Sequence, residues 1–173
     1  SPLYVYDAVV LRGRAQVLRA ALPPEVDLAF ATKANPSPLV LETWRAAGLG
    51  ADVASAGELR AVLRAGFDPG SVVFTGPGKT DAELAAALEA GIGALTLDSL
   101  DELESLLGLA DHARPGQGLM LRLATGAASE DRPIISGDGS DKFGLTDIEA
   151  DEALARLHAA GRLAPSGPFR LRG

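Results

Sequence analysis

Short apolar runs recur along this sequence at an almost constant interval, and this spacing constrains the fold more than any other feature. The runs are LAFAT from Leu28, GADVA from Gly50, VVFT from Val72, ALTLD from Ala94 and GLMLRLA from Gly118. Self-similarity of this kind indicates repeated units of one supersecondary type. Each run has the length of a buried strand. We therefore expect five core strands, and PFRLR (168–172) is a candidate for a sixth.

Helical patterns fill the intervals between these runs. Leu and Ala recur at three- and four-residue spacing, with Gly near the ends, in residues 38–48, 56–66, 82–91 and 100–110, and a further helix is expected from about 8 to 22. Four helix starts have the S/T-x-x-E form of a capping box: Ser55 to Glu58, Thr80 to Glu83, Ser99 to Glu102 and Thr146 to Glu149. The boxes support the helix predictions independently of the periodicity.

Buried strands that alternate with helices predict right-handed βαβ units and a parallel sheet, hence the α/β class. The period would also suit a leucine-rich-repeat solenoid, but the L-x-x-L-x-L-x-x-N pattern is absent. We predict a TIM-type (β/α)8 barrel. Because a closed barrel has eight strands, residues 8–173 are expected to be its truncated N-terminal part, with about five to six units. Residues 1–7 are expected to form a strand of a second, β-type domain.

The totals exclude several classes of partner. The net charge of −7, with scattered basic residues, disfavours nucleic acid. No apolar segment approaches the roughly 20 residues of a membrane span, and a cytoplasmic protein is expected. The absence of cysteine removes disulfides and thiolate metal ligands, and no metal site is predicted.

Polar and charged residues stand at the C-terminal ends of the predicted strands, where parallel α/β folds bind ligands. They are Lys33 after the first strand, Asp52 and Ser55 after the second, Thr75 and Gly76 after the third, Asp98 after the fourth and Arg122 on the fifth. A lysine at this place is either a solvated cation or an amine able to form a Schiff base. The sequence alone leaves both alternatives open.

The other candidates also have structural explanations. Helix capping alone would account for Ser55 and Glu58, and Asp98 would favour the positive end of the next helix. Asp52 lies in an apolar run, where an unpaired carboxylate is costly. Arg122 stands between two leucines, so we expect it to be buried and to need an anion.

Three further features carry weaker predictions. TGPGKT (75–80) is not a phosphate-binding P-loop, because Val73 stands where that motif requires glycine. His112 and His158 are expected at the surface. The aperiodic stretch 126–141 is either a functional loop or a disordered excursion, and the sequence favours neither.

Five linked motifs carry a family resemblance: ATKANPSP, GADVASAGEL, VVFTGPGKTDAEL, LDSLDELE and SDKFGL. In this order and spacing the chain resembles the fold-type III pyridoxal-phosphate-dependent amino-acid decarboxylases, the diaminopimelate, ornithine and arginine decarboxylase group. The resemblance implies a barrel followed by a β-domain, a homodimer with active sites at the subunit interface, and pyridoxal 5′-phosphate as cofactor.

The resemblance also assigns roles to residues. Lys33 matches the lysine that holds the cofactor as a Schiff base. Asp52, Ser55 and Glu58 match a D-x-A-S-x-x-E motif near the cofactor, and Arg122 matches an arginine on the fifth strand. Lys142, Phe143 and Gly144 match a KFG motif near the substrate.

The implied reaction is decarboxylation of a diaminopimelate-like or other basic or dicarboxylic amino acid. Several parts of the family's active site, among them the phosphate loop, would lie beyond residue 173. The chain alone is therefore expected to be an inactive fragment. Two alternatives stay open: an alanine-racemase-like enzyme with the same barrel and lysine, and a catalytically inactive homologue that binds a partner.

Overall fold

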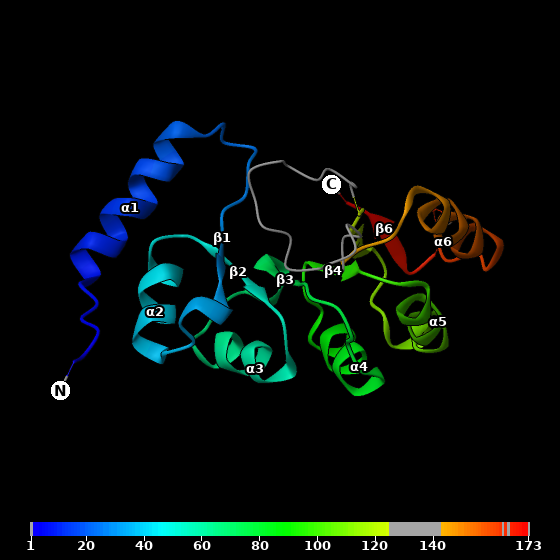
Figure 1. The fold of residues 1–173 in the computed structure, drawn as a ribbon, viewed down its shortest axis with the longest axis horizontal. Coiled ribbons are helices and arrows are strands. Elements are labelled where there is room, and N and C mark those ends of the chain that lie inside the picture. The colour runs from blue at the N-terminus through cyan, green and yellow to red at the C-terminus, as the bar shows by residue number, and fades with distance from the viewer. Residues whose placement is uncertain (1, 125–142, 164, 166, 173) are drawn as a thin grey trace. The chain divides into compact units, whose positions relative to one another are not determined.

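Strands and helices alternate along the chain in the computed structural model, which describes residues 2–124, 143–163, 165 and 167–172 (Figure 1). The strands are β1 (Ala29–Ala31), β2 (Gly50–Val53), β3 (Val72–Phe74), β4 (Ala94–Leu97), β5 (Gln117–Leu121) and β6 (Phe169–Leu171). The helices are α1 (Ala8–Ala21), α2 (Pro38–Ala46), α3 (Ala56–Arg64), α4 (Asp81–Ala90), α5 (Leu100–Gly108) and α6 (Asp147–Ala159). Short 3-10 turns η1 (Thr32–Ala34), η2 (Pro69–Ser71) and η3 (Ala110–His112) complete the described part.

The five predicted core strands, the candidate sixth strand and the predicted helices are confirmed, with shifts of one to three residues at their ends. The C-terminal ends of the helices show most clearly why the boundaries differ from the prediction. Gly48, Gly66 and Gly91 were predicted inside the last turns, but each has a positive φ, of 81°, 84° and 67°. This left-handed conformation ends a helix, and glycine adopts it without steric cost. None of the described helices is both long and apolar enough to cross a membrane.

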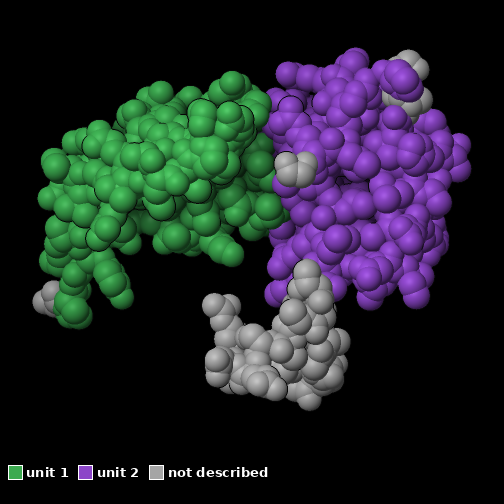
Figure 2. Space-filling model, turned by 90° about the horizontal axis from the view of Figure 1, so that it is seen from above, with its two compact units in different colours: residues 1–75 green, residues 76–173 purple. Residues whose placement is uncertain are grey.

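The chain divides into two compact units, residues 1–75 and residues 76–173 (Figure 2). In the first unit β2 pairs in parallel with β1 and with β3, and Asp52 lies opposite Ala31 and Val73. In the second unit β5 pairs in parallel with β4 and with β6, and Leu97 lies opposite Leu121. All these pairs are parallel, as the α/β prediction requires.

Each unit buries its own apolar core. In the first unit α3 packs on β2, and Val53, Leu59, Val62 and Phe74 are fully buried. In the second unit α5 packs on β4, all of whose residues are buried. Leu103, Leu106, Leu119 and Leu157 lie in this second core. In both units, helices pack on one side of the strands (Figure 1). Polar groups are therefore expected at the carboxyl ends of the strands, away from this apolar packing.

The four predicted helix starts are confirmed, but they are of two kinds. In all four, the Ser or Thr hydroxyl accepts the N–H of the glutamate three residues later. Glu83 and Glu149 complete a capping box by accepting the N–H of Thr80 and Thr146. In the two helices capped by serine, the glutamate accepts the N–H of the residue before the N-cap instead of that of the N-cap itself. Glu58 accepts the N–H of Ala54 at 2.8 Å, and Glu102 accepts that of Asp98 at 3.0 Å.

Residues 2–7 form no strand within this chain, where a strand had been expected for 1–7. Leu3, Tyr4 and Val5 are largely exposed. Asp7 then caps α1, with its Oδ1 accepting the N–H of Val9 at 2.7 Å. A strand needs a partner for its backbone N–H and C=O groups, and the described residues offer none here. The pairing with a second domain stays a prediction.

Gly118→Ala should lower the free energy of unfolding by about 2 kcal/mol. A Cβ at this position of β5 would lie 2.2 Å from the carbonyl oxygen of Gly93, a backbone atom that cannot rotate away. Gly13→Ala is the control, because nothing lies within 4 Å of a Cβ in this α1 position. It should be neutral or stabilise by up to about 1 kcal/mol. Urea unfolding measures both, and equal stability of Gly118→Ala and the wild type would contradict the packing.

The capping box of α6 should make stability depend on pH. The hydrogen bonds from the backbone and side chain of Thr146 lower the pKa of Glu149 below its ordinary value of 4.5. Because the pKa is lowered on folding, this contribution is complete above that ordinary value and is lost as the pH falls through the folded-state pKa. Glu149→Gln keeps a capping group without the charge. Its unfolding midpoint should therefore fall less steeply with acidification than the wild type's.

Candidate active site at the strand ends

In the first unit, the candidate residues lie where the parallel strands end. Lys33 is in η1, directly after β1, and its side chain is exposed. Its ammonium has no hydrogen-bond or ion-pair partner among the described residues. Asp52 is in β2 and lies opposite the last residue of β1. Parallel pairing thus brings the ends carrying Lys33 and Asp52 to the same edge of the sheet.

Asp52 is held by the residue that follows β3. The Thr75 hydroxyl donates a hydrogen bond of 2.6 Å to Asp52 Oδ1. This bond compensates for placing a half-buried carboxylate in an apolar strand, which the sequence had left unexplained. It also fixes the direction in which the carboxylate points.

Ser55 and Glu58 serve the start of α3. Ser55 Oγ accepts the N–H of Glu58 at 3.2 Å, and Glu58 Oε2 accepts the N–H of Ala54 at 2.8 Å. The capping explanation is therefore confirmed for both residues. Their predicted role at a cofactor stays a prediction.

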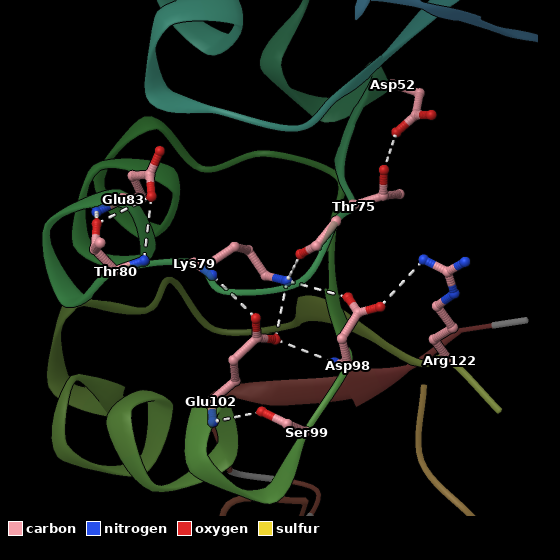
Figure 3. A network of polar contacts seen from close by, with 10 residues as sticks. Asp52, Thr75, Lys79, Thr80, Glu83, Asp98, Ser99, Glu102 and Arg122 are labelled. Atoms are coloured by element: carbon pink, nitrogen blue, oxygen red, sulfur yellow. Dashed lines mark hydrogen bonds and ion pairs between the residues drawn. The ribbon is translucent and has the colours of Figure 1, made fainter. Parts of the chain in front are cut away.

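The second unit carries a buried charge cluster at the end of β4 (Figure 3). Asp98 follows β4 directly, and its Oδ2 lies 3.3 Å from Lys79 Nζ. Glu102 Oε2 lies 3.0 Å from the same nitrogen. The side chains of Lys79 and Asp98 are each 2% exposed and that of Glu102 is 5% exposed. We call these three residues the buried charge cluster.

Arg122, which is partly exposed, forms an ion pair with Asp98 of this cluster. Its Nη1 lies 3.3 Å from Asp98 Oδ1. The expectation of a buried arginine was wrong, because 42% of its side chain is exposed. The expectation of an anionic partner was right. β5 ends at Leu121, so the arginine already stands beyond the paired strand and its head reaches solvent.

Sequence reasoning missed the roles of Lys79 and Glu102. Lys79 lies in the TGPGKT turn, which was rejected as a phosphate loop, and Glu102 was assigned to a capping box. Both residues stand in motifs of the family resemblance, but neither was given a role at the site. Asp98 was interpreted through the helix dipole, whereas its carboxylate pairs with two cations. One sequence signal could have indicated the cluster. Lys79 stands in the turn after one strand, and Asp98 and Glu102 follow the end of the next strand. Only the fold shows that these groups meet.

Phe143 and Gly144 of the KFG motif also reach Arg122. The guanidinium carbon lies 4.9 Å from the centre of the Phe143 ring, a cation–π contact. The N–H of Leu145 donates to the carbonyl of Arg122 at 2.7 Å. Gly144 has a φ of 98°, and a Cβ there would lie 2.7 Å from that same carbonyl. Lys142 and the stretch 126–141 lie outside the described residues.

His112 and His158 are exposed, as expected. Nδ1 of His112 lies 3.8 Å from a carboxylate oxygen of Glu89 on α4. Across the described ranges, no group of three or more His, Cys, Asp or Glu side chains is arranged to hold a metal ion. The strand ends present an exposed amine and a fixed carboxylate in the first unit, and a partly exposed guanidinium in the second.

The chain belongs to the family of the pyridoxal-dependent decarboxylases, whose pyridoxal-binding domain matches residues 10–164. The family resemblance inferred from the five motifs is thereby confirmed. So is the barrel-type α/β fold, since solved decarboxylases of this family superpose on nearly the whole chain.

Individual relatives agree with the family. The chain is 37% identical over 162 residues to the diaminopimelate decarboxylase of Zymomonas mobilis, a match covering 91% of this chain and 38% of the relative. The crystal structure of Helicobacter pylori diaminopimelate decarboxylase complexed with L-lysine has a TM-score of 0.81 at 27% identity, over 99% of this chain and 42% of that one. Lysine/ornithine decarboxylase of Vibrio vulnificus, complexed with putrescine, has a TM-score of 0.76 at 28% identity, over 100% and 40%. The chain thus spans about two fifths of these relatives.

The residues present fit pyridoxal phosphate. The cofactor carries an aldehyde, which needs an accessible primary amine, and Lys33 supplies one that is exposed and unpaired among the described residues. The cofactor also carries anionic and polar groups, with which charged side chains can interact. Asp52 of the first unit and Arg122 of the second are charged side chains, each fixed by a neighbouring side chain.

Lys79→Met should destabilise the protein by about 3 kcal/mol, because it leaves the buried Glu102 carboxylate without a cation and Asp98 with Arg122 alone. Arg156→Met is the matched control. It also removes a cation with two carboxylate partners, Glu104 and Glu152, but on an exposed face of α6. Exposed pairs contribute little, so this variant should unfold close to the wild type. Similar urea midpoints for the two variants would contradict the buried charge cluster.

Proposed function

We propose that this chain is the N-terminal part of the pyridoxal-phosphate-binding barrel of an amino-acid decarboxylase, a carboxy-lyase. The single observation that carries the proposal is the place of Lys33. It presents an exposed amine directly after β1, in a chain that matches the pyridoxal-binding domain over residues 10–164. The whole enzyme would be a homodimer, and this piece alone would be inactive.

Lys33 would hold the cofactor through its ε-amine. An amine must be unprotonated to attack an aldehyde, and a lysine tied in a strong ion pair would resist losing its proton. Lys33 has no such pair among the described residues, unlike the buried Lys79. This contrast supports Lys33 as the cofactor-bearing lysine.

The other residues would orient the cofactor. Asp52, fixed by Thr75, presents a carboxylate at the same sheet edge as Lys33. Arg122, held between Asp98 and Phe143, presents a guanidinium suited to an anion. Lys142, Phe143 and Gly144 would contact the substrate side. When bound, the cofactor supplies an electron sink for the bond that releases carbon dioxide.

The proposed substrate is a diaminopimelate-like or another basic or dicarboxylic amino acid. This rests on the relatives, which are diaminopimelate decarboxylases in Zymomonas mobilis and Helicobacter pylori and a lysine/ornithine decarboxylase in Vibrio vulnificus. The molecules bound in the two crystal structures, L-lysine and putrescine, each carry an amine at the end of an alkyl chain.

Lys33→Ala should abolish covalent attachment of the cofactor in the full-length protein. The wild type, loaded with pyridoxal phosphate, should absorb near about 420 nm, and borohydride should fix the cofactor on the peptide that contains Lys33. Lys33→Arg is the control, since it keeps the positive charge without a condensing amine. It should lose the band as completely as Lys33→Ala. Peptide mapping that places the reduced adduct on Lys79 or Lys142 would refute the assignment.

A further inference from the structure

Lys79 is a buried charged group that the proposed function does not use. Its ammonium donates to the carbonyl of Gly76 at 2.7 Å, to Glu102 Oε2 at 3.0 Å and to Asp98 Oδ2 at 3.3 Å. An ammonium has three protons to donate, and here three acceptors surround it. Lys79 therefore has no donor left for a ligand. Any effect it has on the site must pass through the residues it holds.

Glu102 makes the arrangement rigid. Its Oε1 accepts the backbone N–H of Lys79 at 3.0 Å, and its Oε2 accepts the backbone N–H of Asp98 at 3.0 Å. One carboxylate thus ties the turn before α4 to the end of β4. Glu58 ties only the backbone of Ala54 at the corresponding start of α3. At the start of α5, the equivalent glutamate instead fixes the backbone of two charged residues, Lys79 and Asp98.

Asp98 connects the cluster to Arg122. One carboxylate oxygen faces Lys79 and the other faces Arg122, each at 3.3 Å (Figure 3). Lys79, Asp98 and Glu102 together carry one excess negative charge, which a low-dielectric interior tolerates poorly. Arg122 supplies the balancing charge from the exposed side. The guanidinium is therefore held on its inner side by a carboxylate that cannot easily turn away.

We propose that Lys79 and Glu102 are positioning residues for Arg122, acting through Asp98, and that they fix the guanidinium in the orientation used for the cofactor. The inference rests on the proposed function, because it takes Arg122 as a cofactor-binding residue. It goes further in assigning a role to the lysine of the TGPGKT turn. Phe143 supports the guanidinium from another element, so Asp98 is one of the two side chains that contact it among the described residues.

The test is a double-mutant cycle in the full-length protein, with the dissociation constant of pyridoxal phosphate as the readout. Lys79→Met should weaken cofactor binding about tenfold, within the range of coupled neighbours. In an Arg122→Ala background the same substitution should change the dissociation constant little. Its effect on the urea unfolding midpoint should persist in both backgrounds. Asp98→Asn, which keeps the shape and removes the charge, should reproduce the pattern if Lys79→Met does not fold.

A second readout needs no cofactor. Phenylglyoxal modifies guanidinium groups, and a held, ion-paired arginine reacts slowly. Peptide mapping of the cofactor-free protein should show Arg122 reacting several-fold faster in Lys79→Met than in the wild type. Thr80→Ala is the control, because it removes the adjacent α4 cap without touching Asp98. It should lower stability while leaving the reactivity of Arg122 and the cofactor affinity unchanged.

The outcomes separate the two proposals. A wild-type protein that binds no pyridoxal phosphate would refute the proposed function, whereas the phenylglyoxal comparison would still report on the hold of Asp98 on Arg122. Equal weakening of cofactor binding by Lys79→Met in both backgrounds would overturn the positioning role and leave Lys79 a purely structural residue. Unchanged reactivity of Arg122 in both Lys79→Met and Asp98→Asn would also overturn it.

Discussion

Parallel strand pairing is the constraint on which the rest of this structure depends. A parallel pair requires a crossover connection, and here each crossover within a unit passes through a helix that buries one side of the strands. Because paired strands run in the same direction, their carboxyl ends lie at the same edge of the sheet. Lys33 and Asp52 lie at such an edge in the first unit, and Asp98 and Arg122 pair at one in the second.

The turns that leave the strand ends show how a repeated local motif acquires a specific task. In both helices that begin at a serine, the glutamate accepts the backbone N–H of the residue before the N-cap. In the first unit that residue is Ala54, and the hydrogen bond does no more than close the turn. In the second it is Asp98, and the same hydrogen bond fixes a carboxylate between two cations. One side chain thus converts a capping interaction into a charge cluster.

Lys33 and Lys79 differ in exposure and in pairing, the two properties on which their proposed roles rest. Covalent chemistry needs an accessible, reactive amine, whereas electrostatic support needs a saturated, immobile one. Burial and three acceptors make Lys79 suitable for the second task. Exposure and the absence of a partner among the described residues make Lys33 suitable for the first. Residue type alone would not separate them.

The sequence by itself determined the order and type of the elements, because apolar periodicity, S/T-x-x-E starts and terminal glycines are local signals that need no distant contact. It also identified Lys33, Asp52 and Arg122 as strand-end candidates, and its motifs pointed to the family. Only the tertiary structure decided which charges meet. Lys79 and Asp98 are 19 residues apart in the chain, and Asp98 and Arg122 are 24 apart. Such pairings depend on strand register and on how far each side chain is buried, and the sequence pattern specifies neither distance nor burial.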